Sequence, residues 1–277
     1  MNSLTEARVV GSLGNITIDR NAPSVVCNFS ENGWRFDYFF HGIGAKNLLV
    51  FFPSALVRGK RHVPSFHRWS WAKNFENADV ICVSDPTLFL HQEMLGAWCQ
   101  GKRDDWILPR TLAHILQLQQ KFGYSRIVFC GSSLGGFLAL QAGTLAPSLG
   151  FDAEKCRVFS ENPQVSLPKY MWTSHMNRLA QVSFGVPTIS DVEDKYLPQL
   201  DVVELIKKTN HIPKGLLVIK ESDAHHYEAH VGYLQGGVSL DAENNLRVEV
   251  ISAAVDSTGH TPLTFDEMSA RVIPFFH

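Results

Sequence analysis

Residues 126–146 read RIVFCGSSLGGFLALQAGTLA, and this stretch decides the fold of the chain. It opens with a short apolar run over residues 127–130, which is typical of a buried strand. A pentapeptide of the form G-x-S-x-G follows, with Ser133 at its centre. Residues 137–146 are rich in Leu and Ala and free of Pro, as a helix requires. The pattern therefore predicts that Ser133 lies at a sharp turn between a strand and a helix.

Two glycines of the pentapeptide, Gly131 and Gly135, explain how such a turn can form. Neither has a Cβ atom, so the incoming strand and the outgoing helix can approach closely around the serine. The start of the helix also points unpaired backbone N–H groups at this position, where they can stabilise an oxyanion. The alternatives are a glycine-rich turn without chemistry and a phosphate loop. A phosphate loop is disfavoured because no Lys-Ser or Lys-Thr pair follows, and the G-x-G-x-x-G spacing is not met.

Composition and charge limit the class of protein. The chain has 277 residues, of which 45% are hydrophobic and 19% charged, as in a soluble globular protein. The formal charge of −2 gives no electrostatic reason to expect nucleic acid or an anionic membrane as a partner. No apolar run reaches the length of a membrane span, and the opening residues MNSLTEARVV lack the pattern of a signal peptide.

Cysteine usage indicates the redox environment. The chain has an odd number of cysteines without paired spacing, and two of them fall inside apolar runs: Cys27, Cys82, Cys99, Cys130 and Cys156. This pattern predicts reduced, buried thiols, and with them a cytoplasmic protein.

Further strands are expected on both sides of the central stretch. Residues 15–18 and 34–40 alternate in polarity around a turn at residues 31–33, which predicts an N-terminal antiparallel hairpin. The remaining predicted strands are short, largely apolar runs over residues 47–52, 78–83, 157–160, 215–220 and 246–251.

Helices are expected between these strands. Pro109 and Gly123 mark the start and the end of one helix, and residues 264–276 form the last. Alternating strands and helices predict a mostly parallel twisted sheet with helices on both faces, in a single domain over residues 1–277. The irregular, mostly helical segment 164–213 is too long for an ordinary connection and is expected to form a small lid.

A serine nucleophile needs a base and a group that orients the base. Asp223 follows the predicted strand at 215–220, and His260 follows the one at 246–251. Both therefore belong at the carboxyl edge of the sheet, in the chain order Ser, Asp, His. Glu221 and Asp256 remain alternatives for the acid.

With these residues in place, the chain resembles the α/β-hydrolase superfamily over roughly residues 45–277. The resemblance implies that Ser133 is the nucleophile, Asp223 the orienting acid and His260 the base. It also implies an oxyanion hole that combines the backbone N–H of Leu134 with a donor after the strand at 47–52. Pro53 cannot donate there, so Ser54 or Ala55 would supply the second N–H.

Two further groups of residues are candidates for binding. Arg68, Trp69 and Trp71 belong to a loop at the same edge and could stack on a sugar or bind an anion, unless the indoles simply pack beneath the loop. Asn162 could contact substrate or only make a turn. A zinc site made by Asp223 with the neighbouring histidines 225, 226 and 230 is disfavoured, because their spacing matches no helical zinc motif. No metal and no cofactor is predicted.

The sequence thus predicts a serine hydrolase that cleaves an ester or related acyl bond through an acyl-enzyme on Ser133. Its expected partner is a small-molecule or glycan-linked acyl substrate, and the oligomeric state is left open. An acyltransferase acting on a glycan or small alcohol is the first alternative, and a non-catalytic binding protein of the same fold is the second.

Overall fold

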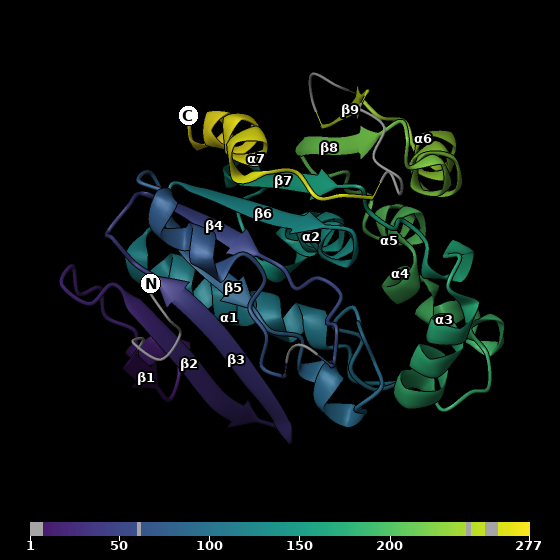
Figure 1. Ribbon diagram of the computed structural model, residues 1–277, viewed down its shortest axis with the longest axis horizontal. Coiled ribbons are helices and arrows are strands. Elements are labelled where there is room, and N and C mark those ends of the chain that lie inside the picture. The colour runs from purple at the N-terminus through teal and green to yellow at the C-terminus, as the bar shows by residue number, and fades with distance from the viewer. Residues whose placement is uncertain (1–7, 60–61, 242–244, 253–259) are drawn as a thin grey trace.

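The computed structural model describes residues 8–59, 62–241, 245–252 and 260–277 (Figure 1). Within these ranges one sheet contains the strands β1 (Arg8–Val10), β2 (Ser24–Glu31), β3 (Trp34–His41), β4 (Asn47–Phe51), β5 (Asp79–Val83), β6 (Arg126–Ser132), β7 (Cys156–Glu161), β8 (Gly215–Lys220) and β9 (Leu246–Ile251). Their order across the sheet is β1-β2-β3-β5-β4-β6-β7-β8-β9.

The sheet is mostly parallel, as predicted. From β5 to β9 every neighbouring pair is parallel, whereas β3 runs antiparallel to both β2 and β5. The β2–β3 pair is the expected N-terminal hairpin, and its turn places Asn32 and Gly33 at φ 50° and 81°. The prediction of a strand over residues 15–18 was wrong. A 3₁₀ turn occupies Leu13–Asn15, and Ile16 is buried in the core instead of pairing in the sheet.

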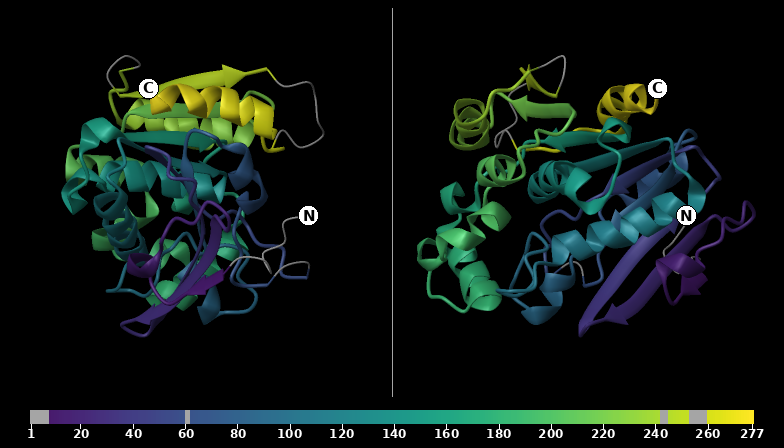
Figure 2. Two further views of the ribbon diagram at one scale, coloured as in Figure 1. Left: turned by 90° about the vertical axis from the view of Figure 1, so that its left-hand side faces the viewer. Right: turned by 180° about the vertical axis from the view of Figure 1, so that it is seen from behind.

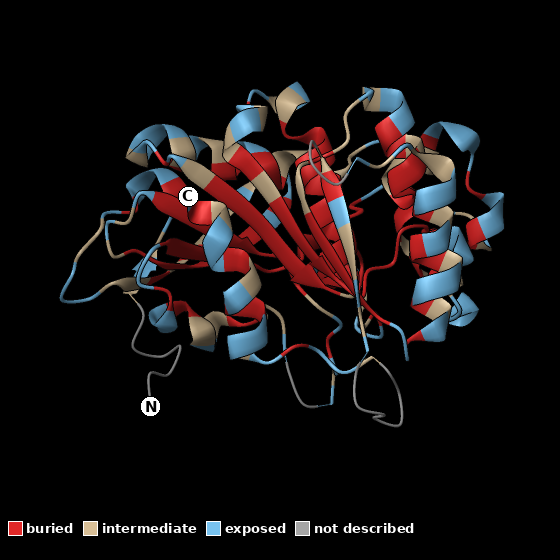
Figure 3. Ribbon diagram, turned by 90° about the horizontal axis from the view of Figure 1, so that it is seen from above, coloured by how far each residue is buried: buried red, intermediate tan, exposed pale blue. Residues whose placement is uncertain are grey.

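Helices cover both faces of the sheet, as predicted. They are α1 (Ile107–Phe122), α2 (Leu134–Leu145), α3 (Thr173–Leu179), α4 (Leu197–Leu200), α5 (Val202–Thr209), α6 (Tyr233–Gly237) and α7 (Phe265–Val272). Along β4, Leu48 and Val50 belong to the core beneath α1 and α2, while Leu49 and Phe51 belong to the core beneath α7. Figure 3 shows the buried strands between helices whose outer surfaces are exposed.

The segment 164–213 is built from short helices and turns. Its last helix, α5, returns to pack beside α2. Its earlier part, with α3 and α4, lies beyond the arrowheads of β6, β7 and β8 (Figures 1 and 2). This position is near the carboxyl edge of the sheet; the action of the segment as a lid, like the single-domain boundary, stays a prediction.

Two further sequence predictions can be compared with the structure. All five cysteines are buried and none forms a disulfide. In the described part of the chain, no helix combines the length and the apolar character that spanning a bilayer requires.

Candidate active site

Ser133 lies between β6 and α2, at the turn that the sequence predicts. Its backbone has φ 54° and ψ −117°, a combination that residues with a side chain rarely adopt. The backbone N–H of Ser133 donates to the carbonyl oxygen of Glu161 over 2.8 Å, which ties the turn to the end of β7. A Cβ atom on Gly131 would lie 2.0 Å from the backbone of Gly135, so the turn closes only with glycine at position 131. A Cβ atom on Gly135 would lie 2.8 Å from the carbonyl oxygen of Pro53, just after β4.

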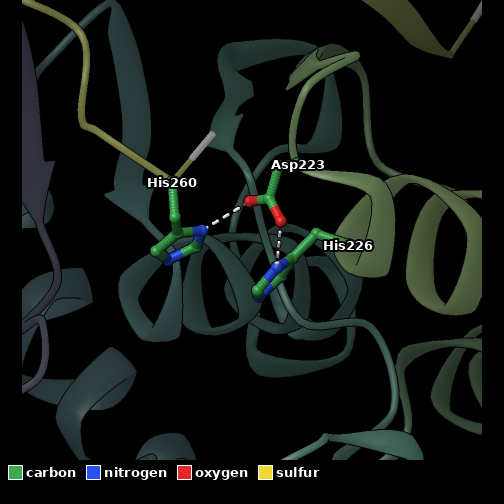
Figure 4. A group of neighbouring side chains, drawn as sticks. All are labelled: Asp223, His226 and His260. Atoms are coloured by element: carbon green, nitrogen blue, oxygen red, sulfur yellow. Dashed lines mark hydrogen bonds and ion pairs between the residues drawn. The ribbon is translucent and has the colours of Figure 1, made fainter. Parts of the chain in front are cut away.

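Asp223 and His260 meet as the sequence predicts (Figure 4). Asp223 follows β8, and its Oδ2 lies 2.5 Å from Nδ1 of His260. Burial raises the pKa of the Asp223 carboxyl, but hydrogen bonds from His226 and His260 outweigh burial and hold that pKa well below its usual range. The carboxylate therefore stays ionised and can orient the His260 ring.

His226 is the second imidazole on the same carboxylate (Figure 4). Its Nδ1 lies 2.9 Å from Oδ1 of Asp223, and its ring stacks on the His260 ring with centroids 4.4 Å apart and planes at 24°. Burial is the main cause that lowers the pKa of His226. The sequence analysis noted His226 as one of the histidines near Asp223, but did not predict that it shares the Asp223 carboxylate with His260.

Gln164 connects the serine to this pair. Its Nε2 lies 3.0 Å from Oγ of Ser133 and 3.0 Å from Nε2 of His226. The described contacts include no hydrogen bond from Ser133 directly to either His226 or His260. The sequence placed Gln164 at the correct edge of the sheet, but no local pattern distinguishes it from an ordinary turn residue.

A second group of predicted residues surrounds the serine. Leu134 begins α2, and Ala55 lines a small cavity together with Ser133 and Leu134. Ser54 is partly exposed on the same loop. The cavity measures about 20 Å³ and is otherwise lined by Leu95, Gly96, Trp98, Gln164, Tyr170, Trp172 and His175.

Arg68 points inward rather than toward solvent. Its guanidinium donates to Oε2 of Glu161 over 2.9 Å and also contacts the Sδ atom of Met268. Both side chains of the Arg68–Glu161 pair are nearly inaccessible, at 3% and 1% exposed. The structure thus brings Arg68 against the end of β7 and not against Ser133.

The two tryptophans of the loop are partly exposed. Trp69 packs edge-on against Phe39, and Trp71 packs edge-on against Phe265. Both also line an open cleft of about 570 Å³, whose wall includes Pro262 from the segment that follows His260. Trp69 and Trp71 therefore do both: each packs against a buried or partly buried phenylalanine, and each also lines the cleft.

Asn162 is buried at the end of β7. Its Oδ1 accepts the backbone N–H of Lys220 over 2.9 Å, which links β7 to β8. Among the residues that the structure describes, its Nδ2 has no hydrogen-bond partner. Asn162 thus supports the strand ends from which Asp223 and Gln164 extend.

Potential metal ligands group differently from the cluster weighed in the sequence. Asp223, His226 and His260 place ligand atoms within 4.8 Å of one another. Two hydrogen bonds to the carboxylate account for this grouping without an ion. His230 instead accepts the backbone N–H of Val165 at Nδ1, over 3.2 Å. Asp256, the alternative acid, lies outside the described residues, and Glu221 accepts the hydroxyl of Ser252.

Comparison with known proteins identifies the fold. No protein-family model matches the chain, and neither does any curated protein sequence. Solved structures do match. The capsule O-acetyltransferase of Neisseria meningitidis serogroup A, in a mutant form in complex with CoA, gives a TM-score of 0.59 at 16% identity, with 91% of this chain and 95% of that chain covered.

Two esterases are similar to a comparable extent. Acetyl xylan esterase 1 from Thermoanaerobacterium gives a TM-score of 0.56 at 15% identity and covers 95% of this chain and 86% of its own. Carboxyl esterase 2 from the fungus Tuber melanosporum gives 0.55 at 13% identity, with 98% and 88% covered. The parallel sheet, the strained serine turn and these structural relatives together identify the chain as a protein with the α/β-hydrolase fold.

Proposed function

We propose that the protein is a serine enzyme that transfers a short acyl group from an ester, with water as the acceptor. The observation that supports the proposal is the strained turn at Ser133. Its hydroxyl is linked through Gln164 and His226 to Asp223, the carboxylate that also binds His260. Such strain persists only where the surrounding structure holds it, and it concentrates at functional sites. The esterases and the O-acetyltransferase among the structural relatives support the same class of chemistry.

The reaction begins with attack by Ser133 Oγ on the ester carbonyl. His260, held at Nδ1 by Asp223, takes the hydroxyl proton at Nε2 and returns it to the leaving alcohol. The N–H of Leu134, with a donor from Ser54 or Ala55, stabilises the oxyanion. An acyl-enzyme on Ser133 forms, and water activated by His260 then releases the acid. For the first step, His260 Nε2 must come within hydrogen-bond reach of Ser133 Oγ.

The small cavity beside Ser133 supports a short acyl group. It measures about 20 Å³, and on that measure a single water occupies about 10–15 Å³. Beyond the carbonyl it therefore accommodates a methyl group but not a long chain. We propose acetyl esters as the preferred substrates, with Trp172 limiting longer chains from its position on the segment 164–213.

A panel of p-nitrophenyl esters of rising chain length tests this proposal. The wild type should hydrolyse the acetate fastest, and Ser133→Ala should show only the uncatalysed rate with every ester. Trp172→Ala should raise the butyrate-to-acetate ratio of kcat/KM about tenfold, since one or two extra methylenes are worth about 1–3 kcal/mol in such a pocket. Fast turnover of long-chain esters by the wild type would contradict the assignment of acetyl esters.

Transfer of the acyl group to a glycan is the second candidate function. The open cleft that Trp69 and Trp71 line favours it, because partly exposed indoles stack well on sugar rings. The assay is incubation of the enzyme with p-nitrophenyl acetate or acetyl-CoA, with and without an excess of oligosaccharide. Acetylated oligosaccharide at the expense of free acetate would establish transfer. Unchanged acetate release would leave hydrolysis as the activity.

A further inference from the structure

The side-chain amide of Gln164 is held in one orientation beside Ser133. Gln164 is 1% exposed, and its amide meets three different groups. The indole N–H of Trp98, which can only donate, lies 3.4 Å from Oε1 of Gln164. The amide oxygen must therefore face Trp98, and the NH₂ group faces Ser133 and His226.

The same reasoning fixes the tautomer of His226. The NH₂ group of Gln164 donates to Nε2 of His226, so this nitrogen carries a lone pair and not a proton. The proton is then on Nδ1, where it is donated to Asp223. Burial lowers the pKa of His226, which keeps the ring neutral while its neighbour His260 becomes charged during catalysis.

Strained backbone holds Trp98 in place. Trp98 and the next residue, Cys99, both have left-handed backbone conformations, with φ 48° and 47°. The N–H of Cys99 donates to the buried carboxyl of Asp85 over 3.1 Å, which stabilises this unfavourable turn. Trp98, which orients the Gln164 amide, is therefore held by a strained turn that the Asp85 carboxyl stabilises.

We propose that Gln164 is a catalytic residue of this site. Its side-chain amide donates an N–H to the oxyanion that forms when Ser133 attacks the ester, and His226 and Trp98 are the positioning residues that hold the amide. This inference rests on the proposed acyl transfer through Ser133. The amide nitrogen is 3.0 Å from Ser133 Oγ, and the oxyanion will be bonded to the same carbon as Oγ. An N–H in this position can therefore follow the developing charge.

Two observations favour Gln164 as an oxyanion donor that is positioned by His226, over His226 as a second base. Nε2 of His226 already accepts from Gln164, and no hydrogen bond joins His226 to Ser133 in the described chain. In addition, Pro53 stands where the loop after β4 would begin to supply an oxyanion donor, and proline has no N–H. A side-chain donor from Gln164 adds to the backbone N–H groups of Leu134 and of Ser54 or Ala55.

Steady-state kinetics with p-nitrophenyl acetate test the inference. Gln164→Met keeps the length of the side chain but removes both N–H groups. It should lower kcat about 10²–10³-fold, as loss of an oxyanion donor does elsewhere, with little change in KM. Binding of a trifluoromethyl ketone, which forms a tetrahedral adduct with the serine, should weaken by a similar factor. Wild-type values of both would overturn the assignment.

Variants of the positioning residues provide the second arm. His226→Phe and Trp98→Phe should each lower kcat about tenfold, and the double variant Gln164→Met/His226→Phe should be no slower than Gln164→Met alone. Additive losses would mean that His226 acts independently of Gln164. If His226→Phe were as inactive as His260→Ala while Gln164→Met stayed active, His226 would be the proton acceptor and the inference would be wrong. Trp98→Phe keeps the test valid should Gln164→Met fail to fold.

The control separates this inference from the function on which it rests. If Ser133→Ala retains turnover, the proposed acyl transfer itself fails. If Ser133→Ala is inactive but Gln164→Met has wild-type kcat, only the role of Gln164 is rejected.

Discussion

Asp223 binds two imidazoles at once, one through each carboxylate oxygen. Both rings therefore present Nε2 away from the carboxylate, and the two nitrogens can serve different partners. His226 accepts from the Gln164 amide, which leaves His260 as the ring available for proton transfer. One carboxylate thus orients both the proposed base and the residue that holds the amide.

Substitution of Asp223 by Asn tests this shared role. An asparagine can donate to one ring nitrogen, so it favours the wrong tautomer in at least one imidazole. We expect Asp223→Asn to lower kcat for p-nitrophenyl acetate by about 10⁴-fold with the fold intact. Glu221→Gln, at the alternative acid position, is the matched control and should keep wild-type kcat. A loss confined to the Glu221 variant would reassign the acid.

His230 supplies a prediction about pH and stability. Burial, followed by the neighbouring histidines, lowers the pKa of His230 to about 3, below the 6.5 expected in the unfolded chain. Between these values the unfolded state binds the extra proton, so the free energy of unfolding rises with pH through this window. In urea unfolding between pH 3 and 6.5, His230→Gln should reduce the rise of the free energy of unfolding with pH by the contribution of one proton. An unchanged slope would contradict the buried neutral histidine.

Sequence patterns predicted Ser133, Asp223 and His260 because each follows a recognisable strand. Gln164 and His226 could not be assigned in the same way. The orientation of the Gln164 amide depends on Trp98, which is 66 residues away along the chain. Only the folded positions of both side chains show that the amide faces the serine.

At the level of elements, the central parallel strands were predicted closely because they are apolar and buried on both faces. The strands at 215–220 and 246–251 have the predicted bounds, and the helix after Pro109 differs only by starting at Ile107. The alternating residues 15–18 were misleading because only Ile16 is fully buried there, and the chain turns rather than pairs. Alternation over four residues is too short to specify a partner strand.

The serine turn is the element whose geometry is most tightly constrained. A methyl group on Gly131 would lie 2.0 Å from the backbone of Gly135, and backbone cannot move aside as a flexible side chain can. Gly131→Ala should therefore destabilise the protein by about 3 kcal/mol and abolish turnover, since β6 and α2 must separate. Gly236→Ala in α6, where a Cβ atom meets nothing within 4 Å, is the control and should change stability by less than about 1 kcal/mol. Equal effects in urea unfolding would contradict this reading of the turn.

At the scale of the whole molecule, Glu161 joins three distant segments around the site. Its carbonyl accepts the N–H of Ser133, its Oε2 accepts from Arg68, and its Oε1 accepts the N–H of Leu263, close after His260. The loop after β4, the serine turn and the segment that carries His260 are therefore held by one residue. Arg68 is therefore connected to the serine turn through Glu161, although its guanidinium is buried away from Ser133.

Removal of one partner of this buried ion pair tests the connection. Arg68→Met should lower the free energy of unfolding by about 3–5 kcal/mol, because it leaves the Glu161 carboxylate buried without its cation. Lys207→Met breaks the exposed pair with Glu204 and should leave the free energy of unfolding nearly unchanged. Urea unfolding measures both, and equal costs would show that the buried pair does not brace the structure.

Covalent labelling identifies the residue that accepts the acyl group. The protein is incubated with p-nitrophenyl acetate, quenched in acid and digested, and the acetylated peptide is located by mass spectrometry. The wild type should carry one acetyl group on Ser133, and neither Ser133→Ala nor His260→Ala should carry one at that position. An acetyl group on another residue, or wild-type labelling in His260→Ala, would contradict the proposed roles of Ser133 and His260.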